Sequence, residues 1–383
     1  MRTRAGTRLW VCGPSKPDKS GETQRRRANF GTVWSVISTV ESRPHPQPQE
    51  NLTDRSREGT SDKTPRVSVI IPVRDRRSML RGALEALAKQ TYRDFEVVVV
   101  DDGSSDGSGE EVFAVPELCA RIVRTEGIGA VAARRVGVET ARGDVLGFTD
   151  SDCLPDPEWI SVAMSSIDDG ADLVQGATHP LRAVGLLERS VGVEWEDGLY
   201  ATCNIFYTKA AYEEAGGFHS GGEELLGFRS GGMARGLGFG EDTLLGWNVR
   251  RRRRAVFEPQ AVVRHEVIRP SLGELVKRAW ISGAFPSLVR EVPELRETLL
   301  RRRYFLGYRR LPLYAFAVAL LSRRERLAAM FGAWWLVARA SEVIRRGGIR
   351  RKTIVAVPVE LGVDAVTAVA LVMGSVRAKR VVL

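Results

Sequence analysis

Short apolar runs rich in Val and Ile alternate with helix-patterned segments from residue 67 onward, and this alternation constrains the fold more than any other feature of the chain. The runs "VSVIIPV", "FEVVVVD" and "DVLGFTD" have the length and composition of buried strands. Between the first two, Leu80, Leu84 and Leu87 recur on one face at helical spacing. The alternation predicts an α/β domain with a mostly parallel central sheet flanked by helices.

Composition divides the chain into three predicted parts. Residues 1–64 are rich in Arg, Ser, Thr, Pro and Gly and lack periodicity, which predicts a disordered basic extension, or translation from a start codon upstream of the native one. Residues 65–268 carry the strand and helix alternation of the α/β domain. In residues 269–383, apolar segments alternate with arginine-rich ones, which predicts a helical region.

The apolar C-terminal segments fit two interpretations. "LPLYAFAVALLS" and "LAAMFGAWWLVARA" are too short to span ~30 Å of hydrocarbon, and the last segment holds Pro358, Glu360 and Asp364. Helices lying in the membrane interface, with Trp334 and Trp335 among the headgroups, are slightly favoured over an ordinary helical bundle. We therefore expect a cytoplasmic protein with a peripheral contact to the cytoplasmic face of a membrane.

Cysteine spacing and charge exclude two other classes of protein. The four cysteines are scattered with no C-x-x-C pair, which argues against a zinc ribbon or a disulfide framework and fits a reducing compartment. The net charge of +10 comes largely from the first 65 residues and from arginine runs at 250–254 and 301–303. These runs lack interleaved aromatic residues, so we expect no nucleic-acid partner.

Acidic side chains follow three of the predicted strands. Asp75 comes after the first, Asp101 and Asp102 end the second, and Asp150 and Asp152 follow a later one. Ligands of parallel sheets bind beyond the carboxyl ends of the strands, so these acids are expected at one edge. Carboxylates there suit Mg²⁺ or Mn²⁺. Two acids at D-x-D spacing are, by themselves, more often a solvated turn or a helix cap.

Five motifs in a fixed order are more specific than any one of them. They are "VSVIIPVRD", "FEVVVVDDGSSDG", "GIGAVAARRVG", "GDVLGFTDSDCLPDPEW" and "GFGEDTLLGW". Together they resemble the family 2 glycosyltransferases of the GT-A fold, bacterial type, over residues 67–266. The resemblance implies an inverting, metal-dependent transfer of a sugar from a nucleotide-diphosphate donor, UDP-linked as first choice, to a glycan or lipid-linked acceptor in cell-envelope polysaccharide biosynthesis.

The resemblance also implies roles for residues at the sheet edge. Asp152 would bind Mg²⁺ or Mn²⁺, and His265 resembles a further metal ligand, although a lone histidine is as often structural. The residues implied to bind the nucleotide sugar are Pro72, Arg74, Asp75, Asp102, Arg134, Asp150 and Ser151. The chain departs from the family at Arg74 and Asp75, where members often carry an aromatic residue and an asparagine.

Two adjacent acids supply the implied catalytic group. Asp242 resembles the family's base, which accepts the proton of the attacking hydroxyl, and Glu241 is its orienting neighbour. Two acids at a helix start would otherwise indicate only a favourable interaction with the helix dipole. The glycine-dense residues 219–240 before them are typical of a lid. Candidate acceptor contacts are Trp195, Asn204 and Trp247, although a tryptophan in a helix is more often core.

Three alternatives compete with this interpretation. A nucleotide-sugar pyrophosphorylase would need a glycine-rich phosphate loop after the first strand, and "PVRDRRSML" contains none. A receiver domain leaves the later acids unexplained. The third alternative is a catalytically silent nucleotide-sugar or membrane-binding module. The presence of both Asp152 and Asp242 favours an enzyme over this alternative. The sugar, the nucleobase, the acceptor and the oligomeric state stay open.

Overall fold

The computed structural model describes residues 64–218, 239–348 and 351–383. The predicted disordered extension over residues 1–64, apart from Thr64, lies outside the described residues. So does the predicted lid, apart from Phe239 and Gly240.

An eight-stranded sheet forms the centre of the fold, in the order β3-β2-β1-β4-β7-β6-β8-β5. Its strands are β1 (Val67–Val73), β2 (Phe95–Asp101), β3 (Ala120–Arg124), β4 (Val145–Thr149), β5 (Cys153–Pro155), β6 (Leu173–Pro180), β7 (Asn204–Thr208) and β8 (Ala255–His265). β5 and β7 run against the direction of the other six strands. The predicted α/β class with a mostly parallel sheet is confirmed.

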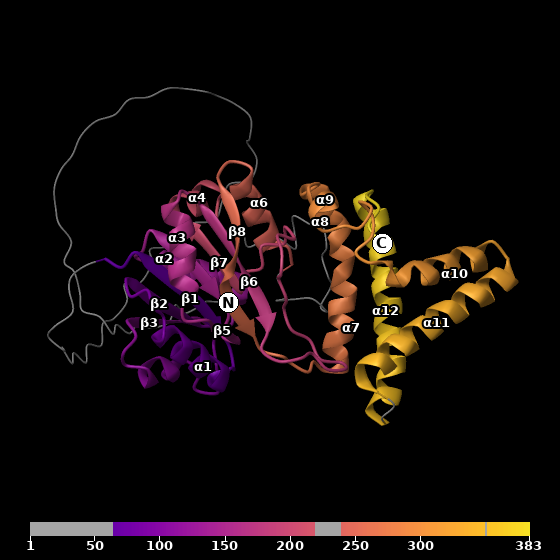
Figure 1. The fold of residues 1–383 in the computed structure, drawn as a ribbon, viewed down its shortest axis with the longest axis horizontal. Helices are drawn as coiled ribbons and strands as arrows, with labels where there is room; N and C mark the ends of the chain where they lie inside the picture. The colour runs from indigo at the N-terminus through magenta and orange to yellow at the C-terminus, as the bar shows by residue number, and fades with distance from the viewer. Residues whose placement is uncertain (1–63, 219–238, 349–350) are drawn as a thin grey trace, which may run out of the picture.

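Helices cover both faces of this sheet (Figure 1). They are α1 (Arg77–Ala88), α2 (Ala130–Thr140), α3 (Trp159–Asp168), α4 (Lys209–Glu214) and α6 (Glu241–Arg250), with a 3₁₀ segment at Gly109–Ala114. Side chains of β1 alternate between the two layers, since Val69 and Ile71 pack with α1 and α3, whereas Ile70 packs on the α2 side. Burial on both faces explains why these strands are continuous apolar runs.

The C-terminal part is helical, as predicted, and stands beside the sheet (Figure 1). Its helices are α7 (Leu272–Ile281), α8 (Phe285–Glu291), α9 (Leu295–Thr298), α10 (Leu311–Leu321), α11 (Glu325–Gly347) and α12 (Arg351–Ala378), with 3₁₀ segments at Ser282–Ala284 and Tyr308–Arg310. Leu288 and Leu371 belong to the same apolar cluster as Ile70 of the sheet, so one core crosses the predicted domain boundary at residue 268.

Two of these helices are long and apolar enough to cross a membrane by length and composition, namely Glu325–Gly347 and Thr353–Ala378. The expectation that "LAAMFGAWWLVARA" is too short was wrong for a structural reason. The helix that contains it continues through the flanking arginine-bearing turns to 23 residues.

A glycine pair fixes α12 against the segment between α7 and α8. A Cβ atom on Gly374 would lie 2.0 Å from the carbonyl oxygen of Gly283, and one on Gly283 would lie 2.8 Å from that of Ala370. Such distances leave no room for side chains between the two backbones. The two segments therefore meet in direct backbone contact.

Candidate active site

The ends of β1, β4 and β8 bring the key side chains together. β5 turns back antiparallel along β8, which pairs Cys153 with His265, and the amide of Glu266 donates to the carbonyl of Asp152 at 2.8 Å. This pairing places residues more than a hundred positions apart in sequence side by side. The acid after β4 and the histidine that ends β8 therefore share one site.

Asp152 has a cation on one side and an imidazole on the other. Its Oδ2 accepts from Nη1 of Arg76 at 2.5 Å, and its Oδ1 lies 3.6 Å from Nε2 of His265. The side chains of Asp152 and His265 are 10% and 9% exposed. A nearly buried carboxylate needs such partners, because an unpaired buried charge is costly.

The proton on His265 can be assigned from its neighbours. Its Nδ1 lies 2.7 Å from the carbonyl oxygen of Glu266, which can only accept, so Nδ1 carries the proton. In the neutral ring, Nε2 then holds a lone pair that faces the Oδ1 of Asp152. Two acceptors that face each other are the arrangement a metal ion satisfies, with the second ring nitrogen fixed by a carbonyl. Asp152 and His265 thus fit a divalent cation.

Cys153 lies in the same cluster, with one possible ligand atom from each of Asp152, Cys153 and His265 within 4.8 Å of the others. A hydrogen bond with Cys203, together with burial, raises the pKa of Cys153 well above its ordinary value. A thiol that keeps its proton is a poor ligand. The available donors are therefore a carboxylate and an imidazole, which suit Mn²⁺ or Mg²⁺ better than a soft thiolate site would.

Arg134 connects the two acidic pairs of the site. Its Nη2 donates to Oδ1 of Asp150 at 2.5 Å, and its side chain is 10% exposed. The same guanidinium interacts electrostatically with Asp242 and Glu241 at the start of α6. Asp150, by contrast, is 28% exposed, and it is held by Arg134 in the way that Asp152 is held by Arg76.

The carboxyl group of Asp242 has a strongly raised pKa. Burial and, to a lesser extent, the neighbouring Glu241 carboxylate together raise the pKa of Asp242 to about 7, against the opposing charge of Arg134. Both acids lie in the first turn of α6, which follows Gly240 in the left-handed conformation. Thr243 anchors that turn, because its hydroxyl donates to the carbonyl of Leu199 at 2.8 Å. A carboxyl group with a pKa near 7 can exchange protons at neutral pH.

Asp102 and Asp75 hold the loops around the predicted nucleotide site. The Asp102 carboxylate accepts from the Thr125 hydroxyl at 2.6 Å and from the amides of Ile128 and Gly129 at 2.7 and 2.8 Å. Asp75 has a φ of 50° and accepts from the amide of Ser105 at 2.7 Å. The two acids therefore shape the loops after β1 and before α2. Their contact with a nucleotide stays a prediction.

Three other predicted nucleotide contacts differ in exposure. Pro72 is buried inside β1, opposite Val100 of β2, and Ser151 is buried between the two acids. Arg74 is 58% exposed and approaches the backbone at Gly127. Arg74 is therefore accessible to a ligand, whereas Pro72 contributes mainly to the wall of the sheet.

Two of the predicted acceptor contacts belong to the core. Asn204 is fully buried, and its amide donates to the carbonyls of Ala177 and Ala261 at 2.7 and 2.8 Å and accepts from the Trp159 indole at 2.7 Å. Trp247 is 6% exposed, and its indole donates to the carbonyl of Gly198. Because their polar groups are already bonded inside the protein, an acceptor role does not fit either residue.

Trp195 differs from those two residues, since it is 61% exposed. Its neighbour Glu196 forms an ion pair with Arg250, whose guanidinium lies 5.3 Å from the centre of the Trp247 ring. An exposed aromatic face can stack on a sugar. Trp195 therefore remains a candidate acceptor contact.

Arg76 is the site residue that the sequence interpretation missed. It lies in the quoted run "PVRDRRSML", directly after Asp75, and its amide donates to the Ser108 hydroxyl at 2.9 Å. A run of arginines at the end of a strand whose neighbours end in acids was the available signal. Which of the three arginines faces Asp152 could not be read from spacing alone.

A sheet edge that gathers acids, two arginines and a histidine defines the kind of α/β site that binds charged ligands. Comparison with known proteins specifies it further. Residues 68–203 match the model of the family described as glycosyl transferase family 2. This part of the chain is therefore similar to glycosyl transferase family 2 domains, in agreement with the first four of the five motifs.

Curated relatives and solved structures were also found. Glycosyltransferase AglE of Haloferax volcanii is 38% identical over 118 residues, 29% of this chain and 39% of the relative. An undecaprenyl-phosphate 4-deoxy-4-formamido-L-arabinose transferase of Pseudomonas fluorescens is 31% identical over 149 residues, 34% of this chain and 44% of the relative. The solved mannosyltransferase PcManGT of Pyrobaculum calidifontis, in complex with GDP-Man and Mn²⁺, is 18% identical with a TM-score of 0.48, covering 83% of this chain and 88% of that chain. The chain matches less than half the length of these curated relatives.

Proposed function

We propose that this protein is an inverting, metal-dependent glycosyltransferase that moves a sugar from a nucleotide-diphosphate donor to a hydroxyl of a glycan or lipid acceptor. The observation that carries this proposal is the Asp152–His265 pair. It presents a carboxylate oxygen and an imidazole nitrogen 3.6 Å apart, and Asp152 lies within the segment that matches the glycosyl transferase family 2 model. A Mg²⁺ or Mn²⁺ ion bound there would neutralise the charge that develops on the departing diphosphate.

The chain's own side chains would perform the remaining steps. Asp242, with a pKa of about 7, accepts the proton of the attacking hydroxyl as the new bond forms. Glu241 keeps that pKa high, and Arg134 opposes it, so the two residues set the pH at which the base is available. Arg134 also bonds Asp150, which is one of the proposed donor contacts.

The donor class and the acceptor class rest on different support. A UDP-linked sugar is the first choice of donor, and Asp102, Asp75 and Arg74 are its proposed contacts. A lipid-linked acceptor draws support from the Pseudomonas fluorescens relative, whose name specifies an undecaprenyl-phosphate substrate. A role in the synthesis of cell-envelope polysaccharide at the cytoplasmic face of a membrane would account for both the nucleotide-sugar donor and the lipid-linked acceptor.

The donor proposal is tested by thermal unfolding with UDP-, GDP- and dTDP-sugars, with and without Mn²⁺. We expect one nucleotide class to raise the melting temperature by several degrees, only when Mn²⁺ is present, because ligands that bind only the folded state stabilise it. A donor effect without Mn²⁺ would contradict the metal requirement. No effect from any donor would contradict the proposal as a whole and favour a catalytically silent module.

Between their ends, the C-terminal helices α11 and α12 bury their charged side chains. Arg339 of α11 is 2% exposed, and its guanidinium contacts Glu360 at 3.1 Å and Asp364 at 3.6 Å, two acids of α12 that are 4% and 0% exposed. The exposed side chains are largely apolar, among them Met330, Trp334, Val337, Ile354, Val355, Val369, Val372 and Val376. Water-soluble helices show the reverse distribution, and charged groups within lipid pair in the interior in this way. These observations support insertion into a membrane.

Vesicle flotation tests this insertion. The full chain should float with phosphatidylglycerol-containing vesicles and stay bound in 1 M salt, which removes contacts that are only electrostatic. Val337→Asp on the exposed face of α11 should lower the bound fraction, whereas Phe113→Asp on the sheet domain should not. Release by salt would instead support helices lying in the interface, and failure to float would contradict any membrane contact.

A further inference from the structure

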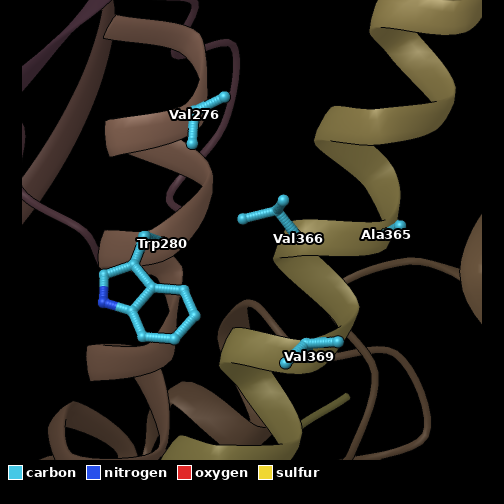
Figure 2. Close-up of a pocket in the computed structure, with 5 residues that line it drawn as sticks. All are labelled: Val276, Trp280, Ala365, Val366 and Val369. Atoms are coloured by element: carbon cyan, nitrogen blue, oxygen red, sulfur yellow. The ribbon is translucent and has the colours of Figure 1, made fainter. Parts of the chain in front are cut away.

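An apolar groove lies between α7 and α12, apart from the acids of the candidate active site. Its lining residues are Val276 and Trp280 of α7 and Ala365, Val366 and Val369 of α12 (Figure 2). Its volume is about 390 Å³, within the ~300–1,000 Å³ range of small-molecule sites. The two helices thus leave room for a ligand of moderate size.

The lining of the groove selects the chemistry of its occupant. All five side chains are hydrophobic, and the groove surface contains no polar atom. A sugar, a nucleotide or a peptide backbone would lose hydrogen bonds to water there and gain none. A hydrocarbon chain has no such requirement, and each methylene it buries strengthens binding roughly fourfold. The groove therefore favours an aliphatic or isoprenoid chain.

The surroundings of the groove supply a route for such a chain. Val369 lines the groove and is also 53% exposed, on the side of α12 that carries Val372 and Val376. This apolar surface belongs to the helices that bury Arg339, Glu360 and Asp364. Exposed arginines lie at both ends of the neighbouring helix α11, at Arg324 and Arg326 and at Arg345 and Arg346, and suit anionic headgroups. Because of this continuity and charge complementarity, we favour a lipid chain over a second protein as the occupant.

The α7 wall of the groove leads toward the candidate active site. Leu272, Val276 and Trp280 recur every four residues, so they lie along one face of α7. Leu272, which is 60% exposed, begins the helix seven residues after His265. Seven residues reach at most ~25 Å. A chain seated in the groove with its polar end toward Leu272 therefore points that end to the start of α7, which lies within this distance of His265.

We propose that the α7–α12 groove binds the hydrocarbon chain of a lipid-linked acceptor and so holds the acceptor's head near Asp242. This inference rests on the proposed glycosyl transfer and names the class of acceptor. The groove recognises the length and apolar character of the hydrocarbon chain, whereas Asp242 and its neighbours act on the polar head group of the acceptor.

The test uses the full chain in vesicles that contain a polyprenyl phosphate carrying a photoreactive diazirine on its chain. After irradiation, labelled peptides are identified by mass spectrometry. We expect labelling at residues 276–280 and 365–369, and at least a tenfold loss of that labelling in Ala365→Phe, which fills the groove. Val376→Phe, on the exposed face of α12, is the matched control and should label as the wild type does. Val366→Phe provides a second groove-filling variant should Ala365→Phe fail to fold.

Several outcomes would overturn the proposal. These are the absence of label in the groove, equal labelling of the groove-filled and unfilled proteins, and equal labelling by a phosphatidylcholine that carries the diazirine on its acyl chain. A groove protected from label by a second copy of the chain, detected as a dimer, would overturn it as well. Donor-induced stabilisation is measured on the same samples. Its loss together with retained groove labelling would contradict the glycosyl-transfer proposal alone and leave the lipid site standing.

Discussion

Asp242→Asn is expected to lower the rate of sugar transfer by about 10²–10⁴-fold, the range for removal of a general base, while the donor still binds. The amide keeps the size of the carboxyl group but cannot accept the proton of the attacking hydroxyl. Steady-state transfer rates and donor-induced thermal shifts measure the two properties separately. Full turnover in this variant would show that Asp242 is not the base.

The pH dependence of the wild-type protein provides the matching control. Because burial and Glu241 raise the pKa of Asp242 to about 7, the transfer rate should rise with pH and level off above pH 7. Glu241→Gln removes one cause of that raised pKa, so the midpoint of the rate profile should move to lower pH. A midpoint that stays in place would contradict the electrostatic coupling of these two acids.

Stability should change in the opposite sense to activity in Asp242→Asn. The pKa of Asp242 is raised from 3.8 in the unfolded chain to about 7 in the folded protein, so its ionisation disfavours folding as the pH rises. The asparagine variant should therefore gain melting temperature relative to the wild type between pH 4 and pH 7, with no further gain above. A variant that is less stable at pH 8 would indicate a packing defect.

Asp152→Asn is expected to weaken Mn²⁺ binding by about 100-fold or more, because it removes the carboxylate that faces His265. Arg76→Gln should have the opposite effect. It removes a cation that bonds the same carboxylate at 2.5 Å and so competes with the metal ion, and we expect Mn²⁺ to bind on the order of tenfold tighter.

Calorimetric or electron paramagnetic resonance titration with Mn²⁺, without any donor, measures both effects independently of activity. Arg81→Gln is the control, since Arg81 bonds Glu111 on the outside of α1 and should leave the affinity unchanged. Equal Mn²⁺ affinity in the wild type and in Asp152→Asn would exclude this acid as a ligand. An unchanged affinity in Arg76→Gln would show that the arginine does not compete.

The strands were predictable because burial on both faces leaves a mark in local sequence. Val69, Ile70 and Ile71 are consecutive apolar residues whose side chains pack into two apolar clusters, one on each face of the sheet. A helix that buries only one face does not need such a continuous run. The carboxyl-end rule then placed Asp150 and Asp152 at the correct edge. Predictions that depended on local pattern and strand direction therefore succeeded.

Predictions that depended on long-range packing were weaker. Asn204 was predicted to contact the acceptor, yet its amide joins β6, β7 and β8 through bonds to Ala177 and Ala261. Arg76 was not distinguished from its neighbours because side-chain direction at the end of β1 depends on the loop that holds Asp75. In both cases the partners lie far away in sequence, where spacing carries no information.

The glycine contact between Gly283 and Gly374 has a mechanical consequence. With backbone against backbone, α12 cannot slide or tilt against the segment that leads into α8 without a clash, and α8 belongs to the core of the sheet domain. The C-terminal helices therefore act as a rigid bracket. If these helices insert into lipid as proposed, the bracket would fix the height of Asp242 above the membrane surface. An acceptor whose head group stands on a spacer of the wrong length would then not reach Asp242.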